Sequence, residues 1–142
     1  MFKTIDATAV TSDTWVNLGS LSTNENMRTF ATTRGAYNPA TSFLLIGGNN
    51  GGVFKVNNPK NIANLNSAVN ITPTGATKAS NTIVSDIAIH PTNPDIVLVV
   101  YANYGINNIF LTTNATSATP TWTLVERNLS AHSIRSAAIT VV

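Results

Sequence analysis

The clearest candidates for acid–base chemistry are Asp86 and His90, which lie in one apolar segment. Side chains an even number of positions apart point to the same face of a regular strand, so the two could act as an acid–base pair. The competing interpretation is structural, because Asp86 lies near the start of a predicted strand and His90 opens a turn with Pro91. We favour the structural interpretation.

The other titratable residues show no spacing typical of a catalytic or metal site. We expect four carboxylates to be solvated loop residues: Asp13, Glu25, Asp95 and Glu126. His132 is isolated, and the absence of Cys excludes thiol catalysis, disulfides and Cys-ligated zinc. The sequence therefore predicts no catalytic residue, no metal site and no cofactor.

Amide and aromatic side chains give a second type of candidate site. Asn49 and Asn50 lie in a Gly-rich loop, while Tyr101, Asn103 and Tyr104 follow an apolar run. Such residues can stack on a sugar and hydrogen-bond to it, or they can pack over sheet ends and occupy left-handed turn positions. These five residues are the candidate binding site for a glycan or protein ligand.

Composition limits the classes of partner. Of the 142 residues, 43% are hydrophobic and 10% are charged, with a net charge of +2. The basic residues are spread singly, which argues against nucleic-acid binding because phosphate contacts need clustered charge. No apolar run approaches the length of a membrane-spanning helix and no hydrophobic signal region follows Met1, so we expect no membrane partner.

Four short runs of β-branched and aromatic residues predict an antiparallel meander in the second half of the chain. The runs cover residues 83–89, 96–101, 109–112 and 121–125, separated by Pro, Asn, Gly and Asp clusters. Such clusters interrupt strands and form turns. The last two runs recur in the rest of the chain: Phe2, Phe54 and Phe110 lie 52 and 56 residues apart, which indicates a repeat with a period near 53.

The first two runs recur as well. Residues 43–47 match 96–101, residues 34–39 match 84–91, and residues 134–141 begin the same element a third time. Tandem four-stranded antiparallel units of this length are typical of β-propeller blades, which bury both faces against their neighbours. The predicted fold is thus all-β, a β-propeller segment with two full blades and partial blades at each end.

The predicted boundaries divide residues 1–142, one propeller segment, into four parts. Residues 1–20 form the last two strands of a first blade, 27–73 a second blade, 83–127 a third, and 133–142 the first strand of a fourth. Two blades cannot close a ring, which normally needs 4 to 8. The expected partners are therefore other blades, from the same longer chain or from other copies.

The turn between the last two strands of each unit resembles the signature of the BNR or Asp-box propellers, the sialidase-, sortilin- and xyloglucanase-like families. That signature is Ser-x-Asp-x-Gly-x-x-x-Trp. Thr4, Asp6 and Trp15 match its skeleton, Thr112, Asn114 and Trp122 match more weakly, and Val56, Asn58 and Ala68 form a decayed copy. Every copy lacks the Gly. The resemblance implies a structural motif, with the acidic residue bonded inside its hairpin and the Trp packed between blades.

The same resemblance bears on catalysis. Sialidases use an arginine triad, a Tyr nucleophile and its acid partner, and the Arg residues of this chain lie in different strand contexts. Xyloglucanase-like enzymes place a catalytic Asp before the Gly pair where this chain has Asn49, and an amide has no titratable proton in range.

We therefore expect a non-catalytic recognition or scaffold module of a secreted or surface protein. One alternative is part of a glycoside hydrolase whose carboxylates lie outside this chain. Another is a self-assembling propeller built from several copies.

Overall fold

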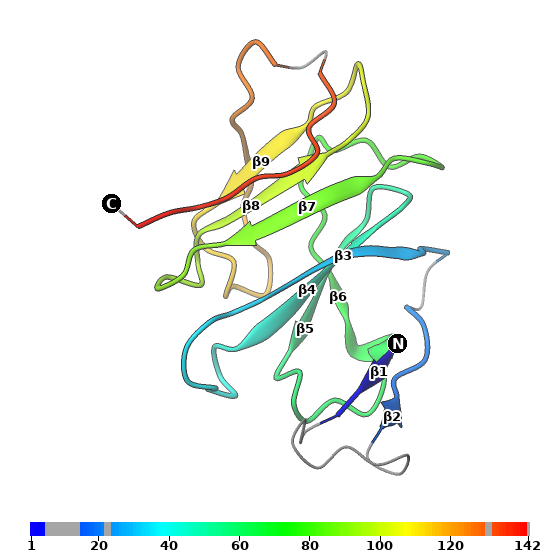
Figure 1. Ribbon diagram of the computed structural model, residues 1–142, viewed down its shortest axis with the longest axis vertical. Coiled ribbons are helices and arrows are strands. Elements are labelled where there is room, and N and C mark those ends of the chain that lie inside the picture. Colours follow the sequence, from blue (N-terminus) through cyan, green and yellow to red (C-terminus); the bar gives the residue numbers. More distant parts are fainter. Residues whose placement is uncertain (5–14, 22–23, 130–131, 142) are drawn as a thin grey trace.

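The computed structural model describes residues 1–4, 15–21, 24–129 and 132–141. It contains three antiparallel sheets and no α-helix in these residues (Figure 1). The first sheet pairs β1 (Phe2–Lys3) with β2 (Val16–Asn17). The second contains β3 (Met27–Thr32), β4 (Phe43–Gly48), β5 (Val53–Asn57) and β6 (Val69–Asn70). The third contains β7 (Val84–Ile89), β8 (Val97–Tyr101), β9 (Ile109–Thr112) and β10 (Thr123–Leu124). A 3-10 turn, Leu65–Ser67, precedes β6.

Both four-stranded sheets are meanders in which each strand pairs with the next along the chain. This confirms the predicted all-β class and the antiparallel meander of residues 83–125. The first strands of the two sheets share an irregularity, because the register shifts between Met27 and Thr29 in β3 and between Val84 and Asp86 in β7. The two sheets therefore share this register shift in the first half of their first strand.

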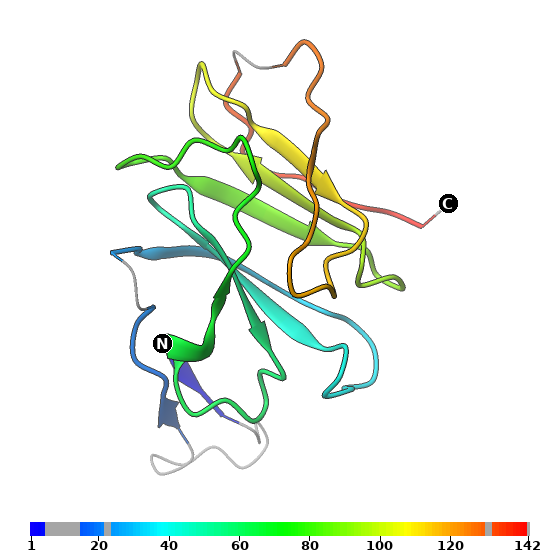
Figure 2. The same ribbon diagram turned by 180° about the vertical axis from the view of Figure 1, so that it is seen from behind.

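One predicted strand is misplaced. Residues 34–39 were matched to β7, but they lie in the loop between β3 and β4. Gly35 has a φ of +88°, and the Asn38 side chain accepts a hydrogen bond from the Ala40 amide, so this segment turns instead of pairing. Residues 134–141, expected to begin a fourth unit, form no regular strand; they run beside β7 (Figures 1 and 2).

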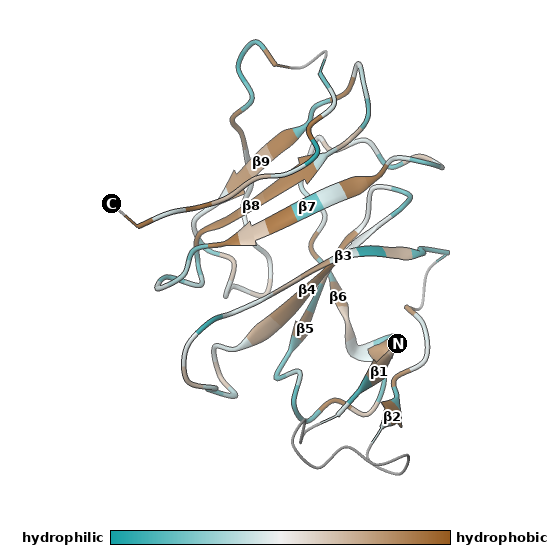
Figure 3. Ribbon diagram, viewed as in Figure 1, coloured by the Kyte–Doolittle hydropathy of each residue, from teal (hydrophilic) through white to brown (hydrophobic). Residues whose placement is uncertain are grey.

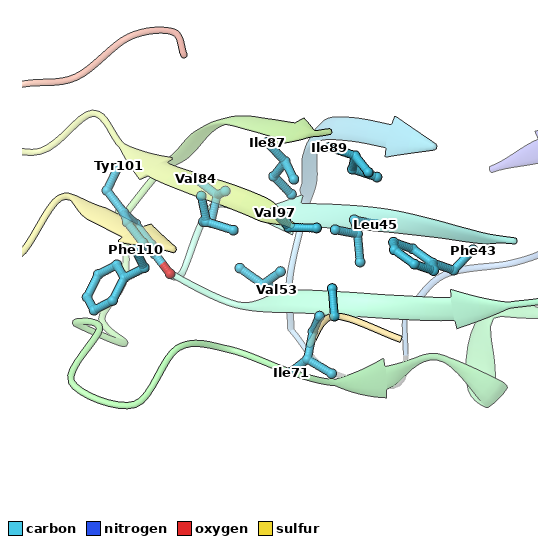
Figure 4. Packing of buried hydrophobic residues seen from close by; sticks show 12 residues of the cluster. Phe43, Leu45, Val53, Ile71, Val84, Ile87, Ile89, Val97, Tyr101 and Phe110 are labelled. Atoms are coloured by element: carbon cyan, nitrogen blue, oxygen red, sulfur yellow. The ribbon is translucent and has the colours of Figure 1, made fainter. Parts of the chain in front are cut away.

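The second sheet buries residues on both faces. One face contributes Leu45 and Val53 to the larger core, where they meet Val97 and Tyr101 of the third sheet (Figure 4). The other face packs against residues that follow β2 and forms a second core of mainly aliphatic side chains: Leu18, Leu21, Ile46, Phe54, Val56 and Leu65. β4 contributes side chains to both cores and carries no polar side chain, as expected of a strand covered on both faces (Figure 3).

Candidate functional site

The loops that connect the second and third strands of each four-stranded sheet carry the predicted binding residues. Asn49 Oδ1 accepts a hydrogen bond of 2.8 Å from the Asn26 amide, and Asn50 Nδ2 donates one of 2.6 Å to the Asn24 carbonyl. In the third sheet, Asn103 Oδ1 accepts one of 2.8 Å from the Ile83 amide. These three side-chain amides therefore hold in place the segment that precedes the first strand of each sheet.

The two predicted tyrosines lie in opposite environments. Tyr101 is fully buried, and its hydroxyl donates a hydrogen bond of 3.2 Å to the Gly51 carbonyl of the neighbouring sheet. Its ring meets Phe110 edge-on at a centroid distance of 5.8 Å, so no ring face is left for a ligand. Burial, with a smaller effect of Glu25, raises the pKa of the phenol far above its ordinary value. Tyr104 is 75% exposed and is the one predicted tyrosine open to a ligand.

Three carboxylates expected to be solvated are instead bound to backbone amides, which corrects the sequence-based prediction: Glu25, Glu126 and Asp95, which accepts a hydrogen bond of 3.0 Å from Thr116 N. Glu25 accepts hydrogen bonds from Asn50 N at 2.8 Å and Gly52 N at 3.0 Å. Glu126 is 3% exposed and accepts one from Asn108 N. The three carboxylates therefore satisfy N–H groups of turns that the strands leave unpaired. Asp13 lies outside the described residues.

Asp86 and His90 are each engaged separately. Asp86 Oδ2 accepts hydrogen bonds from Ser136 Oγ at 2.9 Å and Ala137 N at 3.0 Å, which fastens the chain that follows the third sheet. His90 Nδ1 accepts one from Asn93 N at 3.1 Å inside the turn to β8. The geometry thus agrees with structural roles for both residues.

The residues matched to the Asp-box lie on two hairpins. Asn114 Oδ1 accepts hydrogen bonds from Thr112 Oγ1 at 2.8 Å and from Thr121 N at 2.9 Å, inside its own hairpin. Trp122 is half-buried against the larger core, and its indole donates a hydrogen bond of 2.9 Å to the Ile71 carbonyl of the second sheet. In the first copy, Thr4 follows β1 and Trp15 is 47% exposed. Asp6 lies outside the described residues.

A buried lysine was missed by the sequence analysis. Lys55 on β5 is 1% exposed, and its Nζ donates hydrogen bonds to the carbonyls of Ala115, at 2.9 Å, and Ser117 in the third sheet. Burial lowers the pKa of Lys55, and the charge of Asp95 opposes this effect. Asp95 itself has a lowered pKa, mainly because Thr116 donates hydrogen bonds to its carboxylate. The signal was present in the sequence: Phe-Lys occurs both at Phe2 and at Phe54.

A cavity of about 370 Å³ lies where the first strands of the two four-stranded sheets meet the final segment of the chain. Three equivalent stretches line it together with Arg34: residues 30–32 of β3, 87–89 of β7 and 137–139. Each stretch has an alanine at its centre, namely Ala31, Ala88 and Ala138. Small side chains at these positions allow the three segments to approach one another.

Chemical alternatives are few in the part of the chain that the structure describes. These residues contain no group of three or more His, Asp or Glu side chains able to hold a metal ion. None of their helical segments is long and apolar enough to cross a membrane. Comparison with known proteins identifies no matching family model, no matching curated protein and no matching solved structure.

Proposed function

We propose that the chain is part of a β-propeller and acts as a non-catalytic recognition or scaffold module. The observation that carries this proposal is the packing of β3, β7 and residues 137–139 around one cavity. In a propeller, the first strand of every blade lies nearest the central axis, and three equivalent segments around a common hollow fit that arrangement.

The state of the acidic side chains supports a non-catalytic role. Glu25, Asp86, Asp95 and Glu126 all accept hydrogen bonds from backbone amides. A glycosidase needs two free carboxylates on either side of the scissile bond, one of which can donate a proton. Carboxylates already committed to the backbone are poorly suited to that role.

Ligand recognition is assigned to the end of the sheets that carries Asn50, Asn103 and Tyr104. A hollow of about 340 Å³ lies there beside Glu25, Asn50 and Lys78. Tyr104 offers an exposed ring, and exposed aromatic rings suit a sugar or a peptide. The low content of charged residues agrees with a secreted or surface protein, which is part of the same proposal.

Calorimetric titration with soluble β-glucan and sialylated oligosaccharides tests recognition. We expect binding without hydrolysis, and at least a tenfold loss of affinity in Tyr104→Ala. The matched control is Tyr37→Ala, an exposed tyrosine in the loop between β3 and β4. Equal affinity of both variants would contradict the assigned surface. Asn49→Asp should create no turnover, and product release from either glycan would contradict the non-catalytic role.

A further inference from the structure

The outward face of the third sheet has the same construction as a face that is covered elsewhere in the chain. On the second sheet, the face with Leu45 and Lys55 packs against the third sheet. Leu45 pairs with Lys55 in the same way as Leu98 pairs with Leu111, so the two pairs occupy corresponding positions.

This outward face is only partly covered. Residues 134–141 run along its β7 side, where Ser85 Oγ donates a hydrogen bond of 2.6 Å to the Ile134 carbonyl. Farther from β7, three apolar side chains remain half-exposed: Leu98, Ile109 and Leu111. We refer to these three residues as the docking face. The repeat shows what covers such a face within this chain, namely the next sheet of the same kind.

The first sheet presents the complementary surface. Phe2 is 61% exposed and Trp15 is 47% exposed, whereas Phe110 at the corresponding position is 1% exposed. The hairpins share one register, because Phe2 pairs with the residue two positions after Trp15, and Phe110 pairs with the residue two positions after Trp122. We refer to Phe2 and Trp15 as the docking hairpin. They have the residue types and register of a buried contact between sheets, but no sheet among the described residues covers them.

We propose that the docking hairpin of one copy binds the docking face of a second copy. The contact would reproduce the one between the second and third sheets, where the indole of Trp122 donates to the Ile71 carbonyl. Val125 occupies the position of Ile71: the Ile71 amide bonds to the first residue of β5 at 2.8 Å, and the Val125 amide bonds to the first residue of β9 at 3.0 Å. The Trp15 indole of one copy therefore donates to the Val125 carbonyl of the second copy.

The two surfaces differ from each other, so the interface is heterologous and each copy keeps one free surface after it binds. Heterologous contacts generate rings when the rotation between copies closes. The proposal rests on the repeated packing of sheets and not on the proposed ligand. Loss of glycan binding would therefore leave it unaffected, and a monomeric chain would leave the ligand proposal unaffected.

Light scattering coupled to gel filtration tests the interface on the 142-residue chain. The solution mass of the wild-type chain should exceed its monomer mass of 15.0 kDa. Trp15→Ala removes the docking hairpin, and Leu111→Glu places a charge on the docking face, so each variant alone should be monomeric. Tyr104→Ala is the control, because this exposed ring lies on neither surface, and it should assemble as the wild type does.

Mixing the two interface variants separates a lost contact from a lost fold. Leu111→Glu keeps an intact docking hairpin and Trp15→Ala keeps an intact docking face, so an equimolar mixture should form a dimer containing one copy of each. Circular dichroism should show both variants folded. A monomeric wild-type chain, variants that assemble as the wild type does, or a mixture that remains monomeric would each overturn the proposal.

Discussion

Lys3 and Lys55 make the same contact one repeat apart. Each follows a Phe on a strand, and each extends its ammonium group to backbone carbonyls of the next sheet. Lys3 Nζ donates to the Lys60 carbonyl at 2.8 Å and to the Ile62 carbonyl at 2.6 Å. A repeated polar contact shows that the two sheet interfaces are related beyond their apolar cores. The third position in this series is Leu111, which keeps the outer face apolar.

Replacing Lys55 should test the strength of this contact. In Lys55→Met, the carbonyls of Ala115 and Ser117 lose their donor inside the protein. We expect the free energy of unfolding to fall by about 1–3 kcal/mol, the usual cost of unsatisfied buried groups. Lys3→Met is the matched control, and it should cost less because Lys3 is only half-buried. Urea denaturation of both variants gives the comparison, and an equal loss would contradict the assigned role.

The buried phenol of Tyr101 should make the protein sensitive to alkali. Its pKa is raised in the folded state, so the stabilisation is complete below the ordinary phenol pKa of about 10 and is lost as pH rises above that value. Beyond pH 10, this one group should remove about 1.4 kcal/mol per pH unit. Tyr101→Phe should show a shallower loss between pH 10 and 11 in urea titrations. An unchanged slope would argue against burial of the phenol.

Trp122→Ala should be costly, whereas Trp15→Ala should be nearly neutral in the monomer. The Trp122 ring packs against the larger core and its indole is hydrogen-bonded, so we expect a loss of about 2–4 kcal/mol, below that of a fully buried Trp. Trp15 is 47% exposed and its loss should stay under about 1 kcal/mol. Thermal and chemical denaturation at low protein concentration compare the two variants. Similar losses of stability in both would contradict the packing of Trp122 against the larger core.

Gly48 and Glu25 should be energetically coupled. A Cβ at position 48 would collide with the Glu25 carboxylate, which holds the amides of Asn50 and Gly52. Gly48→Ala should therefore cost about 1–3 kcal/mol by displacing those hydrogen bonds. In the Glu25→Ala background the same change should cost almost nothing further. A double-mutant cycle measures the coupling, and additive losses would show that the glycine acts in another way.

Much of the sheet arrangement could be predicted from the sequence because β8 and β9 are apolar runs bounded by turn residues. The alternating strand β3 was missed, since Met27–Thr32 places Thr and Arg between its apolar residues and only part of each side chain is buried. The loop at residues 34–39 resembled a strand in sequence spacing alone. Pairing with β4 in the folded protein decides that Met27–Thr32, and not residues 34–39, forms the strand.

The candidate site was harder to predict. Tyr101 and Lys55 belong to residue types that are usually at least partly exposed, and their burial depends on a neighbouring sheet that local sequence does not specify. Glu25 and Glu126 looked like loop residues because their partners are backbone amides, which leave no pattern in the sequence. The Asn residues were predicted to bind a ligand, and the structure shows that their amides join segments of the chain.

The most direct test of the central claim is an experimental structure of the chain, which measures the rotation that relates its sheets. A propeller requires one rotation to carry the first sheet onto β5 and β6, and the same rotation to carry the second sheet onto the third, with Ala31, Ala88 and Ala138 nearest the axis. We predict equal rotations about one axis. Two different rotations, or an axis that does not pass beside these alanines, would contradict the propeller.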